Sequence, residues 1–207
     1  MKIQEKFPKK LLVEGNDDQH VIWALCQKYD VIESFDVVDC NGIDDLIEQI
    51  PIRFKSSETK TVGIIVDADD ALQQRWEKIR NILTGTHFEV PADLPADGLI
   101  VSHEIQKAGV WIMPNNRVDG MLEDFISFLV PKDDPLTPIV ESTLSEIESK
   151  ELNKYSERHR SKANIHTWLA WQEDPGTPLG LSITKSYLNA DEETCVKLIN
   201  WLNRLYG

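Results

Sequence analysis

Short apolar runs alternate with helix-patterned segments over the first 85 residues of the chain. Each run is continuously apolar, which is typical of strands buried on both faces, as in a parallel sheet. Each following segment carries apolar residues at helical spacing. The three pairs of strand and helix are expected at 9–15 with 16–30, 35–40 with 41–55, and 59–69 with 70–83. This alternation predicts an α/β fold with a parallel sheet, right-handed crossovers and helices on its faces.

Several residues bear on where these helices begin and end. Asn16 and Asp70 are expected as N-caps of the first and third helices, because their side-chain oxygens can accept from free backbone amides. Asp17 and Asp18 suit the positive end of the first helix dipole. Pro51 is expected to interrupt or end the second helix, since proline donates no backbone hydrogen bond.

The pattern becomes less regular after residue 85. Residues 86–109 contain prolines and acids, and we expect a loop there with one or two short strands. A fourth strand is expected over 110–115. The remaining helical segments are expected over 120–130, 138–173 and 191–207, with a turn-rich stretch at 175–180.

Length and composition indicate an ordinary globular chain, with either one domain of moderate size or one domain and an appendage. It has 207 residues, of which 41% are hydrophobic and 28% charged. We expect an α/β domain over 1–130 and a helical extension over 131–207 packed on it. No membrane segment is expected, because no apolar run is long enough to span a bilayer. Cys26, Cys40 and Cys195 form no zinc or disulfide pattern, so the expected location is the cytoplasm.

The sequence is acidic, with a formal net charge of −13 at pH 7. This charge argues against a protein that binds nucleic acid over its whole surface, because the phosphates would be repelled. It is compatible with a local basic groove, or with an acidic site whose charge is offset by bound metal.

Two of the apolar runs end in acidic residues, in "LLVEG" and "IIVDAD". Because the carboxyl ends of parallel strands gather at one edge of a sheet, Glu14, Asp67 and Asp69 are expected to meet there. Three carboxylates at close range repel one another unless protons or a cation neutralise them. Mg²⁺ or Mn²⁺, bound through oxygens, is the cofactor that this set favours. Gly15 would let the chain turn sharply after Glu14 and let a ligand approach.

These motifs, in this order, resemble the Toprim domain, the metal-binding module of topoisomerases, bacterial primases and the overcoming-lysogenization-defect (OLD) nucleases. The resemblance rests on "LLVEG" before a helix, an Asn41–Gly42 turn after the second strand, and "IIVDAD", and it covers about residues 8–130. The later pieces "GMLEDF", "KANIHTWLAW" and "INWLNRLYG" resemble small stand-alone bacterial Toprim-like proteins of unknown function. The resemblance implies a Rossmann-like parallel sheet followed by a helical extension.

The resemblance also implies roles for individual residues. Glu14 matches the motif's glutamate, a metal ligand or general acid/base, and Asp67 and Asp69 match the pair that holds divalent metal. No tyrosine lies in a motif that marks the topoisomerase nucleophile, so that activity is not expected. Phosphatases of the haloacid-dehalogenase type place Asp-x-Asp after their first strand, whereas here it follows the third.

The OLD nucleases complete a two-metal site with further acids and a lysine. Glu123 or Asp124 would supply the acids here, Lys162 the lysine, and Asp18 is a further candidate. Each has a simpler interpretation. Asp18 fits the first turn of a helix, and Glu123 and Asp124 fit the exposed side of an amphipathic helix.

One basic cluster stands out in this acidic chain, the stretch "KYSERHRSK" at 154–162, here named the basic segment. Arg158, Arg160 and Lys162 within it are the local candidates for contacts to a phosphate backbone. A solvated helix end would explain the same residues.

Two functions from different classes follow. The first is a Toprim-like, Mg²⁺- or Mn²⁺-dependent nuclease or other phosphoryl-transfer enzyme that acts on nucleic acid. The second is a non-catalytic Toprim-fold binding or regulatory protein that acts through a partner in DNA repair or phage defence. An ATPase of the kind fused to the OLD nucleases is one such partner. The three converging carboxylates favour the first function, and the acidic surface favours the second.

Overall fold

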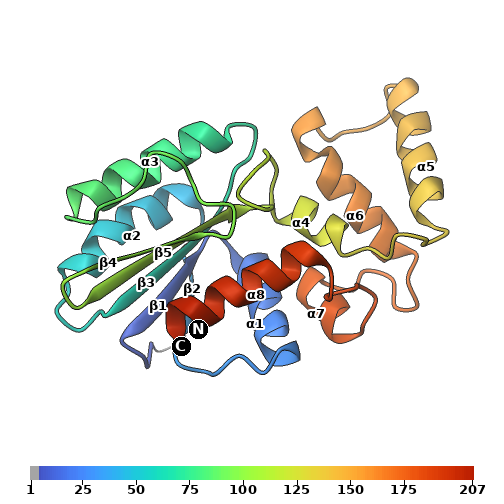
Figure 1. The fold of residues 1–207 in the computed structure, drawn as a ribbon. Helices are drawn as coiled ribbons and strands as arrows, with labels where there is room; N and C mark the ends of the chain where they lie inside the picture. Colours follow the sequence, from blue (N-terminus) through green and yellow to red (C-terminus); the bar gives the residue numbers. More distant parts are fainter. Residues whose placement is uncertain (1–4) are drawn as a thin grey trace.

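A five-stranded sheet forms the centre of the molecule (Figure 1). The computed structural model describes residues 5–207, and the strand order is β2-β1-β3-β5-β4. Neighbouring strands are parallel except for β4, which is antiparallel to β5. The strands are β1 (Lys9–Val13), β2 (Asp36–Asp39), β3 (Thr61–Asp67), β4 (Leu99–His103) and β5 (Gln106–Met113). The predicted α/β fold with a parallel sheet is therefore confirmed.

The fourth predicted strand, 110–115, overlaps the second half of β5, which ends at Met113. This strand begins earlier, at Gln106, because β4 pairs with it as a hairpin. Glu104, in the turn between them, has a φ of 51°. The apolar pattern near residue 110 marks only the part of β5 that is buried against β3.

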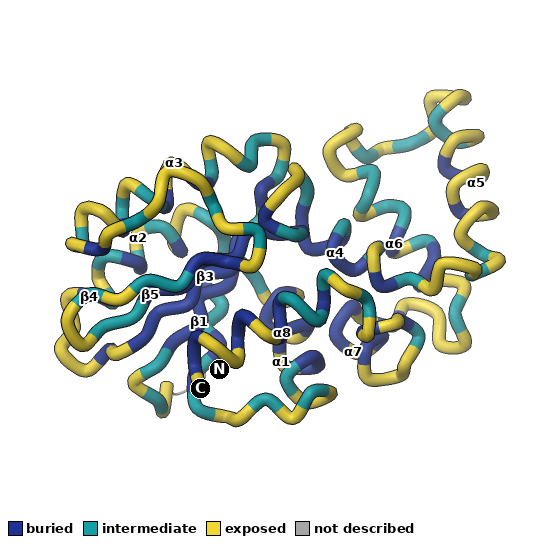
Figure 2. Tube along the Cα trace, viewed as in Figure 1, coloured by how far each residue is buried: buried dark blue, intermediate teal, exposed yellow. Residues whose placement is uncertain are grey.

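Helices cover both faces of the sheet (Figure 1). One face packs against α2 (Ile43–Lys55) and α3 (Leu72–Gly85), and the other against α1 (Asn16–Lys28) and α8 (Glu193–Tyr206). A hydrophobic core lies on each face of the sheet, and adjacent residues of β1 pack in different cores. Leu11 packs in the core with α1 and α8, and Leu12 in the core with α2 and α3. Burial on both faces explains the unbroken apolar runs, and Figure 2 shows β1 and β3 as buried.

The remaining helices lie beyond the carboxyl ends of the strands (Figure 1). The outer helix α5 is largely exposed in Figure 2. The stretch 175–180 was predicted as a turn, but α7 begins within it, at Leu179. Every helix among residues 5–207 is too short or too polar to cross a bilayer. The helices beyond the carboxyl ends of the strands are α4 (Leu122–Phe128), α5 (Thr137–Ser149), the 3-10 helix η1 (Glu157–His159), α6 (Arg160–Ala170) and α7 (Leu179–Thr184).

Helix α8 lies in a groove made by two glycines. Gly63 of β3 is directly opposite Gly109 of β5. A Cβ atom at Gly63 would lie 2.2 Å from the Tyr206 hydroxyl oxygen, and one at Gly109 would lie 2.6 Å from Leu205 Cδ2. The Tyr206 hydroxyl donates to the Lys10 carbonyl oxygen at 2.8 Å. The last part of the expected helical extension is thus a layer of the α/β sandwich.

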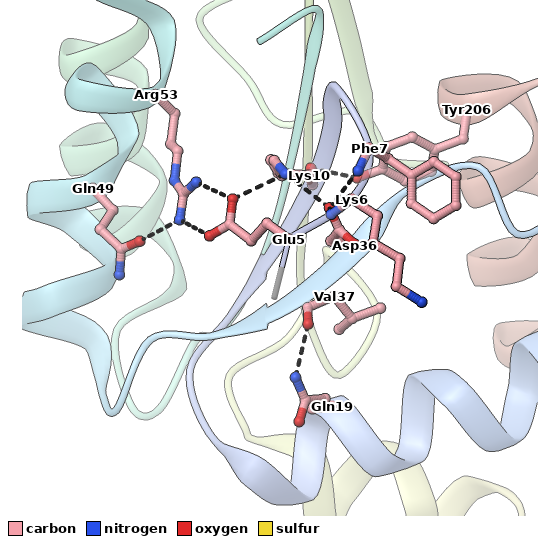
Figure 3. Close-up of polar contacts among 10 residues, drawn as sticks. All are labelled: Glu5, Lys6, Phe7, Lys10, Gln19, Asp36, Val37, Gln49, Arg53 and Tyr206. Atoms are coloured by element: carbon pink, nitrogen blue, oxygen red, sulfur yellow. Dashed lines mark hydrogen bonds and ion pairs between the residues drawn. The ribbon is translucent and has the colours of Figure 1, made fainter. Parts of the chain in front are cut away.

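Charged side chains contact one another at the amino edge of the sheet (Figure 3). Lys10, although buried, contacts the carboxylates of Glu5 at 2.9 Å and Asp36 at 2.7 Å. Arg53 donates two hydrogen bonds to Glu5, at 2.6 and 2.7 Å. Two carboxylates and two cations therefore balance one another at this edge.

The first two helices differ from expectation in their details. Asn16 is the first residue of α1 and not its N-cap; that place is taken by Gly15, whose amide donates to Asp18 Oδ2 at 3.1 Å. Pro51 neither interrupts nor ends α2, which continues to Lys55. The buried side chains Ile50 and Phe54 lie on either side of Pro51 and hold the last turn on the core.

The start of α3 also differs from expectation. Asp70 is not its N-cap, since the helix begins at Leu72. The Leu72 amide donates to Asp119 Oδ1 at 2.7 Å. Asp119, 47 positions after Leu72 in the chain, thus accepts the hydrogen bond at the helix start that was expected of Asp70.

Candidate functional site

An open cleft of about 550 Å³ lies at the carboxyl edge of the sheet, where β1, β2 and β3 end. This is the edge at which parallel α/β sheets bind ligands, and the volume is within the range of small-molecule sites. We name it the carboxylate cleft, because seven acidic residues line it. They are Glu14, Asp17, Asp18, Asp39, Asp67, Asp69 and Glu123.

The structure brings Glu14 and Asp67 together. They follow or end the neighbouring parallel strands β1 and β3. Glu14 Oε1 accepts a hydrogen bond from the Asp67 amide at 2.8 Å. The Asp67 carboxylate in turn accepts from the amide of Leu122, at the start of α4, at 2.9 Å. The two strand ends and α4 therefore meet at these carboxylates.

Asp69 lies in a turn just beyond β3. It has a φ of 56°, and its amide donates to the Gly120 carbonyl oxygen at 2.8 Å. Two arginines hold its carboxylate: Arg75 at Oδ2, 2.7 Å, and Arg158 at Oδ1, 2.6 Å. Arg75 also donates through Nε to the Asp67 carbonyl oxygen at 2.9 Å. Arg75 fixes the turn from Asp67 to Asp69, and no sequence motif indicated this role.

Asp18 is the most deeply buried acid of α1, with 7% of its surface exposed. Its Oδ2 atom accepts from Gly15, but Oδ1 is buried and has no hydrogen-bond partner among residues 5–207. Burial, and then the charge of Glu14, raise the pKa of Asp18 to about 7. The chain bends at Glu14 and Gly15, as expected, although the extended backbone of Gly15, with φ −147° and ψ −177°, is one that other residues can also adopt.

Glu123 and Asp124 have different surroundings, although they are adjacent on α4. Glu123 lines the cleft, is only 4% exposed and pairs with Lys162 Nζ at 2.9 Å. Asp124 is not part of the cleft lining. Its Oδ2 atom accepts from the Met121 amide at 2.8 Å, so it caps the start of α4. The exposed helix face expected as the simpler interpretation of Glu123 is therefore wrong.

The cations of the basic segment also differ in their surroundings. Arg158 and Lys162 reach the cleft and contact Asp69 and Glu123. Arg160 contacts Glu141 at 2.7 Å and Glu148 at 2.9 Å, on α5. Arg160 thus joins two helices of the extension and does not belong to the cleft.

The carboxylates of the cleft repel one another. The pKa of Asp67 is raised well above its ordinary value, first by burial and then by the charges of Asp18, Glu14, Glu123 and Asp69. Burial also raises the pKa of Glu14. The cleft therefore favours protons or another cation.

A sequence model described as "Protein of unknown function (DUF3226)" matches residues 8–207. The chain belongs to this family. The DUF3226 match includes both the strand ends that carry Glu14 and Asp67 and the segment that carries Arg158 and Lys162. No curated protein and no solved structure was found to match the chain.

The donor set of this DUF3226 chain consists of carboxylate oxygens, which suit hard ions such as Mg²⁺ and Mn²⁺. As placed, no three His, Cys, Asp or Glu side chains within 5–207 converge on one metal position. The carboxylate oxygens of the cleft contact backbone amides, arginines and a lysine instead, as seen for Glu14, Asp67, Asp69 and Glu123. The one buried carboxylate oxygen that has no hydrogen-bond partner within residues 5–207 is Oδ1 of Asp18.

A second cleft, of about 580 Å³, lies at the amino edge of the sheet and includes Glu5, Lys10 and Arg53. Its charges are already balanced: Glu5 contacts both cations, and Lys10 also contacts Asp36 (Figure 3). Only the carboxylate cleft combines an excess of acids with a buried oxygen left unpaired among residues 5–207.

Proposed function

We propose that the carboxylate cleft binds Mg²⁺ or Mn²⁺ and serves phosphoryl transfer on nucleic acid, as a nuclease of Toprim-like type. The observation that carries the proposal is Asp18 Oδ1, a buried carboxylate oxygen with no hydrogen-bond partner within residues 5–207, on a side chain that lines the cleft together with Glu14 and Asp67. An unpaired buried polar atom costs about 1–3 kcal/mol, and more when it is charged. A divalent cation would offset this cost.

The carboxylates of Glu14, Asp18, Asp67 and Glu123 would hold the ion, and they would have to move towards a common point, because no three of them converge as they stand. Asp69 would join them if one of its arginines moved away. When bound, the ion would neutralise charge on a phosphate and polarise its oxygen. As an alternative to binding the ion, Glu14, whose pKa is raised by burial, is suited to hold or release a proton at Oε2, since Oε1 accepts from the Asp67 amide.

The proposal includes the cytoplasm as the place of action. Cys26, Cys40 and Cys195 are free, and burial raises the pKa of each thiol to about 11 or 12. Thiols of this kind are largely unreactive at neutral pH and suit a reducing compartment.

A second function is favoured by the pairing of the cleft cations. Arg158 and Lys162 are engaged by Asp69 and Glu123, so no cation of the basic segment that reaches the cleft is free for a nucleic acid as placed. With a net charge of −13, this arrangement fits a non-catalytic metal-binding protein that acts through a partner such as an ATPase.

Calorimetric titration with Mn²⁺ and Mg²⁺ tests the metal site. Asp67→Asn and Asp18→Asn each keep an oxygen that can accept the amide hydrogen bond seen here, so both variants should fold. We expect each to weaken metal binding at least about tenfold. Asp70→Asn is the matched control, because Asp70 is exposed and outside the cleft lining. Equal metal affinity in all four proteins would refute the site.

A cleavage assay separates the two functions. Purified protein is incubated with single- and double-stranded DNA and RNA in Mn²⁺, with Asp67→Asn as the control. Cleavage that disappears in the variant supports the nuclease. Metal binding without cleavage of any of these substrates supports the binding protein.

A further inference from the structure

Asp69 has both carboxylate oxygens occupied by guanidinium groups. Arg75 contacts Oδ2 at 2.7 Å and Arg158 contacts Oδ1 at 2.6 Å. Asp69 lines the cleft together with Asp67 and Asp18, and the buried Oδ1 atom of Asp18 has no hydrogen-bond partner among residues 5–207. Each Asp69 oxygen keeps a second lone pair, but the positive charges of the two guanidinium groups oppose a cation there, so the departure of one arginine would favour cation binding.

The two arginines are held unequally. Arg75 lies on α3, its side chain is 14% exposed, and its Nε keeps a second bond to the Asp67 carbonyl oxygen. Arg158 lies on the short η1, its side chain is 51% exposed, and Asp69 is its only polar partner among residues 5–207. Exposed ion pairs are weak, so Arg158 is the group that can be displaced.

A displaced Arg158 would stay close to the cleft. Its neighbours His159 and Lys162 line the cleft, so the segment is anchored there. The planar guanidinium matches two oxygens of a phosphate, and a divalent ion nearby would draw the same phosphate in. The ligand with this chemistry is a phosphate group beside the metal.

We propose that Arg158 is an exchangeable counter-ion: it neutralises Asp69 while the cleft lacks a divalent cation, and it transfers to a substrate phosphate once the cation binds. This inference rests on the proposed metal binding. It predicts an order of events, with metal first and phosphate second.

The first test is calorimetric titration of wild type and Arg158→Gln with Mg²⁺. We expect Arg158→Gln to bind the metal about two- to fivefold more tightly, because the competing ion pair is gone. Lys154→Gln is the control. It removes the same charge from the same segment, but Lys154 is exposed and forms no ion pair within the described residues. We expect its Mg²⁺ affinity to equal that of wild type.

The second test measures inorganic phosphate binding at saturating Mg²⁺. We expect Arg158→Gln to bind phosphate about tenfold more weakly than wild type and Lys154→Gln. Thermal unfolding of each variant confirms that the fold is retained. If wild type binds Mg²⁺ and Arg158→Gln changes neither affinity, the exchange is wrong and the metal site stands. If wild type binds no divalent cation, both proposals fail.

Discussion

Glu14 Oε1 accepts the Asp67 amide hydrogen bond at 2.8 Å and so joins the carboxyl ends of β1 and β3. The bond uses one oxygen of the carboxylate for the fold, in a side chain that also lines a cleft rich in acids. Structure and chemistry are thus combined in one side chain, and substitutions can separate them.

Glu14→Gln should separate the two roles. It keeps an acceptor oxygen for the Asp67 amide, so we expect little change in the free energy of unfolding but a loss of Mn²⁺ affinity of about tenfold or more. Glu14→Ala removes the acceptor as well and should destabilise the fold by about 1–2 kcal/mol. Urea denaturation and calorimetric titration of both variants measure these effects. Wild-type metal affinity in Glu14→Gln would show that the carboxylate charge is not used.

Asp18 should make stability depend on pH. Its pKa is raised from 3.8 to about 7, so the folded chain binds this proton more tightly than the unfolded chain. The stability gained is fully present below about pH 4 and is lost as the pH rises towards about 7. We expect Asp18→Asn, in chelator, to be about 2 kcal/mol more stable than wild type at pH 8. Urea denaturation across this pH range should show a shallower slope for the variant; parallel curves would contradict the prediction.

Arg75 should matter for stability more than its partial exposure suggests. Arg75→Gln removes the bonds to the Asp67 carbonyl oxygen and to Asp69, and we expect a loss of about 1–3 kcal/mol in the free energy of unfolding. Lys78→Gln, an exposed position on the same helix, is the control and should change stability by less than about 0.5 kcal/mol. Similar effects at both positions would mean that Arg75 acts only through its charge.

Gly63 should not tolerate a side chain. A Cβ atom there would overlap Tyr206, Leu11 and Leu205, at 2.2 to 2.9 Å, so we expect Gly63→Ala to cost about 3 kcal/mol. Gly85→Ala is the opposite case. A Cβ atom added at Gly85, the last residue of α3, would meet no atom within 4 Å apart from its chain neighbours and the backbone of its own helix. The substitution should stabilise the chain by about 0.5–1 kcal/mol. Thermal unfolding of the pair tests whether α8 is seated in the glycine groove.

Local pattern and parallel-sheet geometry were enough to predict the first three strands, the first three helices and the meeting of Glu14 with Asp67. These features can be predicted because each depends on residues close in sequence or on a general rule of strand direction. The contacts that complete the site depend on residues far apart in the sequence, and no such rule covers them. Arg158 reaches Asp69 from a distant segment, and nothing in either local sequence indicates the pairing.

Neighbouring acids show the same limit. Glu123 faces the cleft and Asp124 caps α4, and the difference depends on where the helix begins. The cap of α3 comes from Asp119 and not from Asp70, because a loop beyond β5 returns to the end of β3. Gly63 within a strand does signal a close approach, but the sequence does not say that α8 is what approaches.

The groove formed by Gly63 and Gly109 has a consequence for biosynthesis. The ribosome produces β1, β3 and β5 well before it reaches Glu193–Tyr206, the helix that fills the groove. During that interval one flank of the nascent sheet has apolar strands without their cover, a condition that invites association with other chains. Chaperone capture of the nascent chain should therefore end only after α8 has emerged.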